Sequence, residues 1–495
     1  MNRHYFLKTI SISLVALIAA DCSRFEETTS RPNIVWLFSD DHAYQAIGSY
    51  PGRFENENLT PNIDTLAQDG MAFDRCYVAN SICGPSRATL LTGKHSHMNG
   101  KYDNGGGFNH DQPQFQKTLQ ENGYQTAMIG KIHLRGNMQG FDYWEVLPGQ
   151  GQYWNPEFIT EEGKTAYPGE HSTDVITDRA LNWLKNGRDK DKPFMAMVHY
   201  KAPHRRWHPT ERWKEKFKDR IFPEPDTLFD SYEGRGSAAH NQDMSIEKTM
   251  DMILDVKANQ PERQAELAKI DPDDTKALIR LKYQWYMRDY LACIAGVDEN
   301  VGRILKYLKD NGLDKNTVVM YSSDQGFYLG EHGWFDKRFM YKESFRTPLL
   351  ARWPGVITPG SRNDDLVQNI DFAQTFLDMA GVEFPEDMQG ETLVPLMQGA
   401  TPSNWRDSLY YHYYEYPGVH SVRRHEGVET KRYKLIRFYG EDVPGGEEWE
   451  LYDHEKDPDE MKSIYNDTAQ KERIEEMKEE LQRLRKHYKV PEEQQ

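Results

Sequence analysis

The stretch Cys83-Gly84-Pro85-Ser86-Arg87-Ala88-Thr89-Leu90-Leu91-Thr92-Gly93 places a thiol, a helix-starting proline and an arginine within five residues. Pro85 suits the first turn of a helix, and Gly93 is a typical helix-ending residue. Backbone N–H groups at a helix N-terminus favour negative charge. The stretch therefore predicts an active-site helix that begins at Cys83. The structural alternative is a small buried cysteine at the start of an ordinary helix.

Four apolar runs elsewhere in the chain stop abruptly at polar residues, as buried parallel strands do. These runs and the residues that follow them are 33–38 with Asp40 and Asp41, 124–129 with Lys131 and His133, 193–200 with His204, and 317–323 with Asp324 and Gln325. Helical patterns at 62–70, 115–122, 174–186, 278–311 and 371–380 alternate with them. The alternation predicts an α/β fold, in which ligands bind beyond the carboxyl ends of the strands.

The adjacent carboxylates Asp40 and Asp41 point to a cation, because like charges at one site raise each other's pKa. Hard oxygen ligands at a strand end suit Ca²⁺ or Mg²⁺. A helix cap or a turn is the alternative for an isolated Asp-Asp pair. For Lys131 and His133, the alternative is a surface lysine beside a histidine with satisfied hydrogen bonds.

Composition and charge limit the classes of partner. A chain of 495 residues with 38% hydrophobic and 12% aromatic residues can form two or three units, or one large α/β domain with an appendage. The net charge of −17 argues against nucleic acid and anionic membranes as general partners. An anionic substrate would therefore need a local basic pocket.

The first 22 residues have the pattern of a bacterial export signal. Basic residues precede an apolar stretch from Ile10 to Ala20, and Cys22 follows. Cys22 resembles the acylated cysteine of bacterial lipoproteins, which predicts a membrane anchor with residues 23–30 as a polar tether. We expect an exported protein of the periplasm or the outer membrane.

The stretch 83–93 resembles the signature of type I sulfatases at seven positions, which are Cys83, Pro85, Ser86, Arg87, Leu91, Thr92 and Gly93. In that family the cysteine is oxidised after translation to formylglycine (3-oxoalanine), which implies a sulfatase-maturating enzyme acting on Cys83. The resemblance extends over roughly residues 31 to 465. It implies an alkaline phosphatase-like α/β sandwich with a central, mostly parallel sheet.

The same resemblance implies a catalytic domain at 31–395 and a smaller C-terminal α+β subdomain at 396–495. We expect antiparallel strands in this subdomain at 409–416, 420–424, 431–439 and 449–452, and a helix at 470–487. The polar, weakly periodic region 207–274 is expected to be an insertion that covers or flanks the pocket.

The resemblance also assigns roles to site residues. Hydrated formylglycine at Cys83 would be the nucleophile, and one Ca²⁺ would be held by Asp40, Asp41, Asp324, Gln325 and the modified Cys83. Arg87, Lys131 and Lys337 would neutralise the developing charge. His204, with Lys337, would protonate the leaving alcohol, and His133 would be the base that regenerates the aldehyde.

For the substrate, the aromatic, Gly- and Pro-rich stretch 140–156 suits a wall on which a sugar ring stacks, although a structural loop is the alternative. The stretch resembles the same region of bacterial N-acetylglucosamine-6-sulfatases and of enzymes acting on algal polysaccharides. We expect a carbohydrate sulfatase, first for 6-sulfated N-acetylglucosamine of heparan-type or mucin glycans and second for an algal glycan such as ulvan. Positive charge for neighbouring anionic groups would come from Arg205, Arg206, His208, His332 and Arg338.

Two other functions are kept open. A phosphatase or phosphodiesterase of the same superfamily would use Ser or Thr as its nucleophile and a histidine-rich pair of zinc ions. A non-catalytic glycan-binding lipoprotein would need no nucleophile at all.

Overall fold

The computed structural model describes residues 31–492 together with Met1. The predicted export signal, Cys22 and the tether at 23–30 lie outside the described residues. From Arg31 onward the chain forms one compact unit. The domain boundary expected near residue 395 therefore stays a prediction.

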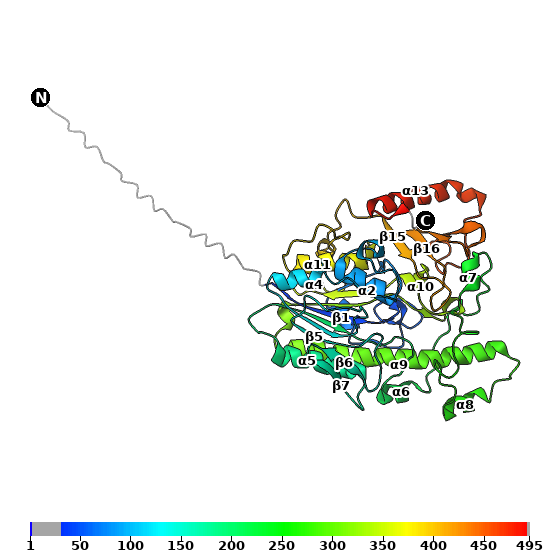
Figure 1. The fold of residues 1–495 in the computed structure, drawn as a ribbon, viewed down its shortest axis with the longest axis horizontal. Helices are drawn as coiled ribbons and strands as arrows, with labels where there is room; N and C mark the ends of the chain where they lie inside the picture. Colours follow the sequence, from blue (N-terminus) through cyan, green and yellow to red (C-terminus); the bar gives the residue numbers. More distant parts are fainter. Residues whose placement is uncertain (2–30, 493–495) are drawn as a thin grey trace. The chain divides into compact units, whose positions relative to one another are not determined.

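The architecture is built on a ten-stranded mixed sheet (Figure 1). Its centre is five parallel strands in the order β9-β1-β8-β4-β5. Their bounds are β9 Thr317–Ser323, β1 Asn33–Ser39, β8 Phe194–His199, β4 Gln125–Gly130 and β5 Tyr143–Val146. Because the five are parallel and adjacent, their carboxyl ends meet along one edge of the sheet.

Antiparallel pairings occur towards the two sides of this sheet. On the β9 side lie β12 (Leu349–Arg352), β2 (Met71–Phe73) and β13 (Ser361–Asn363), and on the β5 side lie β6 (Glu157–Thr160) and β7 (Gly163–Ala166). Two small sheets pair β3 (Cys76–Tyr77) with β14 (Val367–Gln368) and β10 (Tyr328–Leu329) with β11 (Phe335–Asp336).

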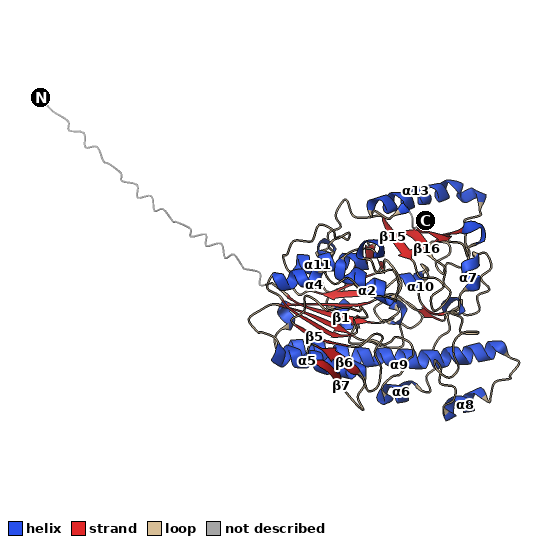
Figure 2. Ribbon diagram, in the orientation of Figure 1, coloured by secondary structure: helices blue, strands red, loops and turns tan. Residues whose placement is uncertain are grey.

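Helices cover both faces of the large sheet, so the central strands are apolar on both sides (Figure 2). Trp36 of β1 packs with Phe115 and Phe376 on one face, and Leu37 belongs to the core that includes Ile294 on the other face. The helices of the first face are α2 (Cys83–Thr92), α4 (Phe115–Glu121) and α11 (Phe372–Met379), and those of the second include α1 (Asp64–Gln68), α5 (Ser172–Asn182) and α9 (Thr275–Asp310).

A separate four-stranded antiparallel sheet lies near the C-terminus. Its strands are β15 (Ser408–Tyr413), β16 (His425–Thr430), β17 (Tyr433–Tyr439) and β18 (Glu447–Asp453), and α13 (Lys471–His487) packs on one face. The strand predicted at 420–424 is wrong, because β16 begins only at His425. His420 instead bonds through Nδ1 to the carbonyl oxygen of Asp243, 2.7 Å away, in the insertion.

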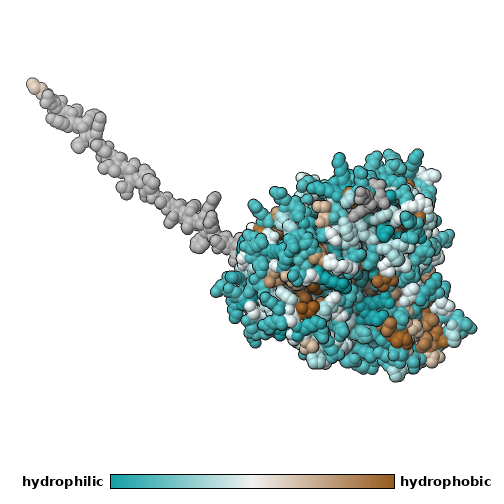
Figure 3. Space-filling model, in the orientation of Figure 1, coloured by the Kyte–Doolittle hydropathy of each residue, from teal (hydrophilic) through white to brown (hydrophobic). Residues whose placement is uncertain are grey.

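The insertion at 207–274 carries three short helices, α6 (Glu211–Phe217), α7 (Ser237–Asn241) and α8 (Pro261–Leu267). The remaining short helices are α3 (Ser96–Asn99), α10 (Lys342–Phe345) and α12 (Val394–Met397). In the part of the chain that the structure describes, none of the helices is long and apolar enough to cross a membrane. The face drawn in Figure 3 is mostly hydrophilic, with scattered apolar side chains.

Helix α2 follows the sequence prediction closely. It begins at Cys83, and Gly93 ends it in the left-handed conformation (φ 63°) with its N–H 2.8 Å from the carbonyl oxygen of Thr89. Every residue of the helix is buried, including Arg87, so its amino-terminal end lies inside the protein rather than at the surface. Such an end can present Cys83 to a buried site.

Gly130 ends β4 and allows a close backbone approach. Its φ is 108°, and a Cβ atom there would lie 1.9 Å from the carbonyl oxygen of His199 in the neighbouring strand. The glycine thus lets the chain turn directly into Lys131, whose N–H donates to that same oxygen at 2.8 Å.

We predict that Gly130→Ala lowers the melting temperature more than Gly123→Ala does. Gly123 has a similar left-handed φ of 86°, but a Cβ atom there would meet nothing within 4 Å, so its substitution costs only the backbone strain, about 1–2 kcal/mol. Gly130→Ala adds a backbone clash. Thermal unfolding of the two variants checks this, and equal losses would contradict it.

Candidate active site

The four strands that the sequence predicted to end in functional residues lie side by side, in the order β9-β1-β8-β4. Backbone hydrogen bonds continue their pairing beyond the strand ends: Asp324 N–H reaches Ser39 O at 3.4 Å and Asp40 N–H reaches Ala202 O at 3.4 Å. Helix α2 meets the same edge, since Ser86 Oγ donates to the carbonyl oxygen of Asp324. The sheet therefore brings together residues from five distant parts of the chain.

Three buried carboxylates, Asp40, Asp41 and Asp324, form what we term the carboxylate cluster. One ligand atom from each of them and from Cys83 all lie within 4.8 Å of one another. The Cys83 thiol donates to Asp40 Oδ1 at 3.4 Å, and the Asp41 N–H donates to Asp324 Oδ1 at 2.9 Å. All four residues are fully buried, so the negative charge is held away from water.

Three buried cations compensate the carboxylate cluster. Arg87 lies 3.1 Å from Asp324 Oδ2 through Nε and 3.4 Å from Asp40 Oδ2 through a terminal nitrogen. Lys131 pairs with Asp40, and Lys337 Nζ lies 2.8 Å from Asp41 Oδ2. Buried charges persist only when they are paired in this way.

The pKa values show that this compensation is incomplete. Burial raises the pKa of Asp41 to about 7 although Lys337 lowers it, and burial with the charge of Asp40 raises the pKa of Asp324 to about 6. Burial also opposes the charge of Asp40, but Lys131 and then Arg87 hold its pKa well below the usual value. Further positive charge would allow all three to ionise.

Gln325 supplies the atom that fits a metal site. Its Oε1 is buried with no hydrogen-bond partner among the described residues, while its Nε2 donates to Asp41. An unpaired carbonyl oxygen beside three carboxylates is a donor set for a hard divalent cation such as Ca²⁺ or Mg²⁺. The four residues predicted as metal ligands in addition to Cys83 are thus gathered at one point.

The Cys83 thiol is a poor nucleophile in this environment. Burial raises its pKa well above the usual value, and the nearby Asp40 raises it further. The thiolate is the reactive form of cysteine, so Cys83 as a free thiol would be nearly inert at neutral pH.

The two predicted histidines occupy different positions. His204 lies with Nε2 3.7 Å from Asp41 Oδ2, and its Nδ1 carries a proton because it contacts the carbonyl oxygen of Arg205, which only accepts. Burial and then Lys131 hold its pKa well below the usual value. The Nδ1 atom of His133 has no hydrogen-bond partner within the described residues, and burial with the charge of Lys131 lowers the pKa of His133 to about 2.

A cavity of about 750 Å³, which we call the cationic pocket, is lined by two of these residues, His204 and Lys337. Among the described residues that line it, Asp336 is the only acidic one. The lining comprises Asn104, Gln150, Gly151, Gln152, Tyr153, Trp154, Lys201, His204, Arg205, Arg206, His208, Asp336, Lys337, Arg338, Val419 and His420. An acidic chain thus contains the local basic pocket that an anionic substrate requires.

Comparison with known proteins identifies the chain. A family model described as "Sulfatase" matches residues 32–382, and one described as "N-sulphoglucosamine sulphohydrolase, C-terminal" matches residues 330–487. The chain belongs to the sulfatase family. It is therefore a hydrolase that acts on sulfuric ester bonds.

Relatives of this sulfatase include glycan-directed enzymes. An N-acetylglucosamine-6-O-sulfatase of Bacteroides thetaiotaomicron is 48% identical over 97% of this chain and 91% of its own. A solved structure in complex with "its substrate D-Glucosamine-2-N, 6-O-disulfate" has a TM-score of 0.88 at 47% identity and covers 94% of this chain and 99% of that one. An ulvan-active sulfatase of Formosa agariphila is 25% identical over 83% of this chain and 74% of its own.

Four of the five residues expected to supply positive charge line the cationic pocket of this sulfatase, namely Arg205, Arg206, His208 and Arg338. The fifth, His332, does not line it. His332 is fully buried, with Nδ1 3.1 Å from Asp230 and Nε2 3.6 Å from Glu343. The expectation that His332 contacts substrate is corrected accordingly. Its imidazole is held by these carboxylates and is enclosed by protein.

The stretch 140–156 is divided between two cavities. Residues 150–154, with Tyr153 and Trp154, line the cationic pocket, while Phe141 and Trp144 line a neighbouring cavity of about 680 Å³ that also includes His133. Of the stretch expected to form an aromatic wall, only the second half therefore lies at the cationic pocket.

Sequence reasoning missed three titratable residues of the pocket. Lys201 follows β8 closely, so the strand-end pattern could have identified it. Asp336 and His420, whose Oδ2 and Nε2 lie 3.1 Å apart, come from segments without such a pattern. Only the fold brings His420 to the pocket.

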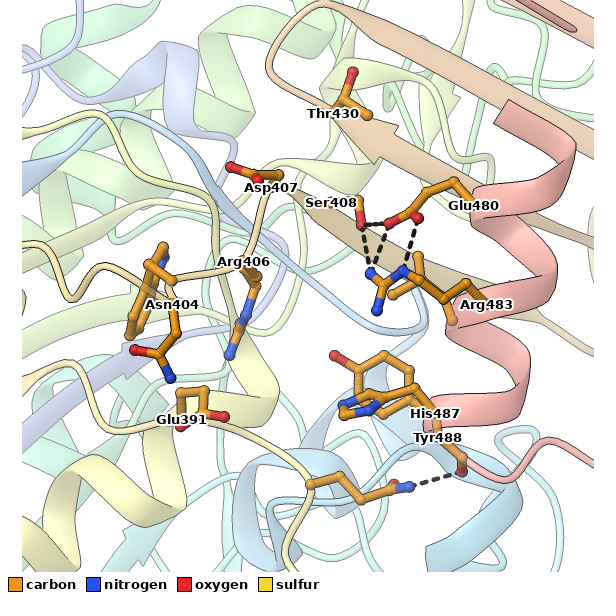
Figure 4. Close-up of a pocket in the computed structure, with 13 residues that line it drawn as sticks. Glu391, Asn404, Arg406, Asp407, Ser408, Thr430, Glu480, Arg483, His487 and Tyr488 are labelled. Carbon is orange, nitrogen blue, oxygen red and sulfur yellow. Dashed lines mark hydrogen bonds and ion pairs between the residues drawn. The ribbon is translucent and has the colours of Figure 1, made fainter. Parts of the chain in front are cut away.

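A second pocket of about 490 Å³ lies beside α13 and is a weaker candidate (Figure 4). Its two arginines already have carboxylate partners: Arg483 contacts Glu480 at 2.7 Å, and Arg406 contacts Asp371 at 2.6 Å. Its described lining residues include neither Cys83 nor a member of the carboxylate cluster.

We predict that Ca²⁺ raises the melting temperature of this sulfatase and that a chelator reverses the effect. A ligand that binds only the folded state stabilises it by about 2.7 kcal/mol at one hundred times its Kd. Because the raised pKa values of Asp41 and Asp324 make protons compete with the metal, the Ca²⁺ effect should shrink from pH 8 to pH 5.

The Asp324→Asn variant is the matched control for this measurement, because it keeps the shape of a ligand and removes its charge. A Ca²⁺ effect that is unchanged in Asp324→Asn would place the metal elsewhere.

Proposed function

We propose that this sulfatase removes the 6-sulfate from glucosamine units of glycosaminoglycan-type chains, with N-acetylglucosamine 6-sulfate as the core of the substrate. The observation that carries the proposal is the cationic pocket, which is lined by His204 and Lys337, both of which contact Asp41 of the carboxylate cluster. The similarity to an N-acetylglucosamine-6-O-sulfatase over nearly the whole chain supports the choice of sugar.

The nucleophile of this proposal is formylglycine made from Cys83 by a maturating enzyme. The high pKa of the thiol supports it, because an unmodified Cys83 could not attack at neutral pH. In the hydrated aldehyde, one hydroxyl oxygen attacks sulfur and the bond between sulfur and the sugar oxygen breaks. Loss of a proton from the second hydroxyl then expels sulfate and restores the aldehyde.

The charges of the site suit this reaction. Arg87, Lys131 and Lys337 surround the carboxylate cluster and can stabilise negative charge on the sulfate oxygens in a buried site. A divalent cation held by Asp40, Asp41, Asp324 and Gln325, which we propose to be Ca²⁺, would add positive charge next to the nucleophile.

The two histidines suit the two proton transfers. His204 lies at the boundary between the carboxylate cluster and the cationic pocket, where a leaving sugar oxygen would emerge, and the negative charge of a bound sulfate ester would favour its protonated form. His133 is held neutral by its low pKa, as a base must be, and is assigned to the regeneration of the aldehyde.

The pocket also suits a sugar ring. Tyr153 and Trp154 offer apolar surface, while Gln150, Asn104 and Asp336 offer hydrogen-bonding groups for hydroxyls. An ulvan-type algal glycan is the second candidate, because an ulvan-active sulfatase matches most of the chain. Cys83, as the precursor of the nucleophile, and the oxygen-rich candidate metal site favour a sulfatase over a phosphatase of the same superfamily.

The proposed place of action rests on the sequence alone. The export signal and Cys22 suit a periplasmic or outer-membrane enzyme that acts on imported or extracellular oligosaccharides.

We predict that active enzyme carries residue 83 as formylglycine. Mass spectrometry of the peptide that contains Cys83 should show the conversion of thiol to aldehyde, and Cys83→Ala should release no sulfate from N-acetylglucosamine 6-sulfate. Full activity of protein whose Cys83 is entirely unmodified would refute the proposed nucleophile.

We predict that the enzyme prefers a 6-sulfated glucosamine over the same sugar sulfated at position 3, over ulvan oligosaccharides and over a small aryl sulfate. Release of free sulfate, measured as kcat/KM on each substrate, checks the order. Much faster cleavage of the aryl sulfate would contradict the carbohydrate assignment, while faster cleavage of ulvan fragments would favour the second candidate.

A further inference from the structure

Lys201 is a buried cation that the mechanism above does not use. It follows β8, lines the cationic pocket and is only 4% exposed. Its Nζ lies 4.9 Å from the centre of the Tyr153 ring. Burial and then the charge of Lys131 lower its pKa to about 7.

Lys201 is also the one lysine or arginine of the pocket without a carboxylate partner among the described residues. The other four are paired: Lys337 with Asp41, Arg205 and Arg206 with Asp255, and Arg338 with Glu415. No hydrogen bond or ion pair within the described chain involves the ammonium group of Lys201. A buried ammonium group without an anion is costly, so the site is built to receive one.

The surroundings of Lys201 indicate where that anion comes from. The carboxylates whose negative charge acts on Lys201 are Asp40 and Asp41, which belong to the reaction centre and are already compensated by other cations. In the pocket, the neighbours of Lys201 are Tyr153 and His208, neither of which is a carboxylate. An anion on a ligand in the pocket is the remaining partner.

We propose that Lys201 is a substrate-binding residue whose ammonium group pairs with a sulfate group of the bound sugar. The inference rests on the proposed function, because it takes a sulfated glucosamine as the ligand. Two sulfate groups could serve: the 6-sulfate that is cleaved, and a 2-N-sulfate on the same ring. Both offer the same chemistry, an anionic oxygen that accepts a charge-assisted hydrogen bond.

The test compares wild type and Lys201→Met on N-acetylglucosamine 6-sulfate and on glucosamine 2-N,6-O-disulfate. Methionine keeps the length and apolar stem of lysine and removes the charge. We expect kcat/KM to fall about 10- to 100-fold, the range of a hydrogen bond to a charged group, with the loss mainly in KM. A fall in kcat/KM on both substrates indicates that Lys201 pairs with the 6-sulfate. A fall confined to the disulfate indicates that Lys201 pairs with the 2-N-sulfate.

Two further variants separate binding from folding. Lys282→Met removes another buried lysine, which donates to the carbonyl oxygen of Glu247 at 3.0 Å outside the pocket, and should leave KM unchanged on both sugars. Lys201→Arg should recover part of the lost affinity. Values of kcat/KM for Lys201→Met within about threefold of wild type on both sugars would overturn the inference, as would a loss that Lys282→Met reproduces.

Failure of the proposed function would look different. The wild type would then release sulfate from neither sugar, and binding of inorganic sulfate would decide the role of Lys201. Stabilisation of the wild type by sulfate that is lost in Lys201→Met would support the inference, and equal stabilisation of both proteins would overturn it.

Discussion

The structure depends on the pairing of buried carboxylates with buried cations at the carboxyl edge of the sheet. Isolated charges in a protein interior are strongly unfavourable, so Asp40, Asp41 and Asp324 can remain there only because cations surround them. Arg87 is central, because it contacts two of the three carboxylates from within α2. The same pairing fixes the helix that carries Cys83 against the ends of the strands that lead to the proposed metal ligands.

This arrangement links fold and chemistry through the order of the strands. Parallel neighbours must end at the same edge, and the four functional strands are neighbours. The edge therefore gathers carboxylates, suited to a divalent cation, together with paired cations, suited to a sulfate ester. The pocket beyond it adds aromatic and hydrogen-bonding groups from loops, which are the parts of a fold that most readily change specificity.

The sequence predicted those features whose signals are local. Apolar runs that end in polar residues located Asp40, Lys131 and Asp324, and the helix rules located α2. Features that depend on tertiary placement were not predictable. His332 lies close to Lys337 in the sequence, yet the chain has a left-handed turn at His332 (φ 58°) that accompanies burial of its ring against Asp230. His420 reaches the pocket from a segment whose pattern of apolar and polar residues predicts a strand. That local pattern does not show the partner of His420 in the insertion, the carbonyl oxygen of Asp243.

The central claim is that the carboxylate cluster holds a metal that, together with residue 83, faces the sulfate to be cleaved. A crystal structure of the Cys83→Ser variant with Ca²⁺ and N-acetylglucosamine 6-sulfate tests it most directly. We predict Ca²⁺ bound by Asp40, Asp41, Asp324 and Gln325, with the 6-sulfate between the metal and Lys337 and the sugar in the cationic pocket. A metal bound to other side chains, or a sugar bound with its 6-sulfate turned away from residue 83, would contradict it.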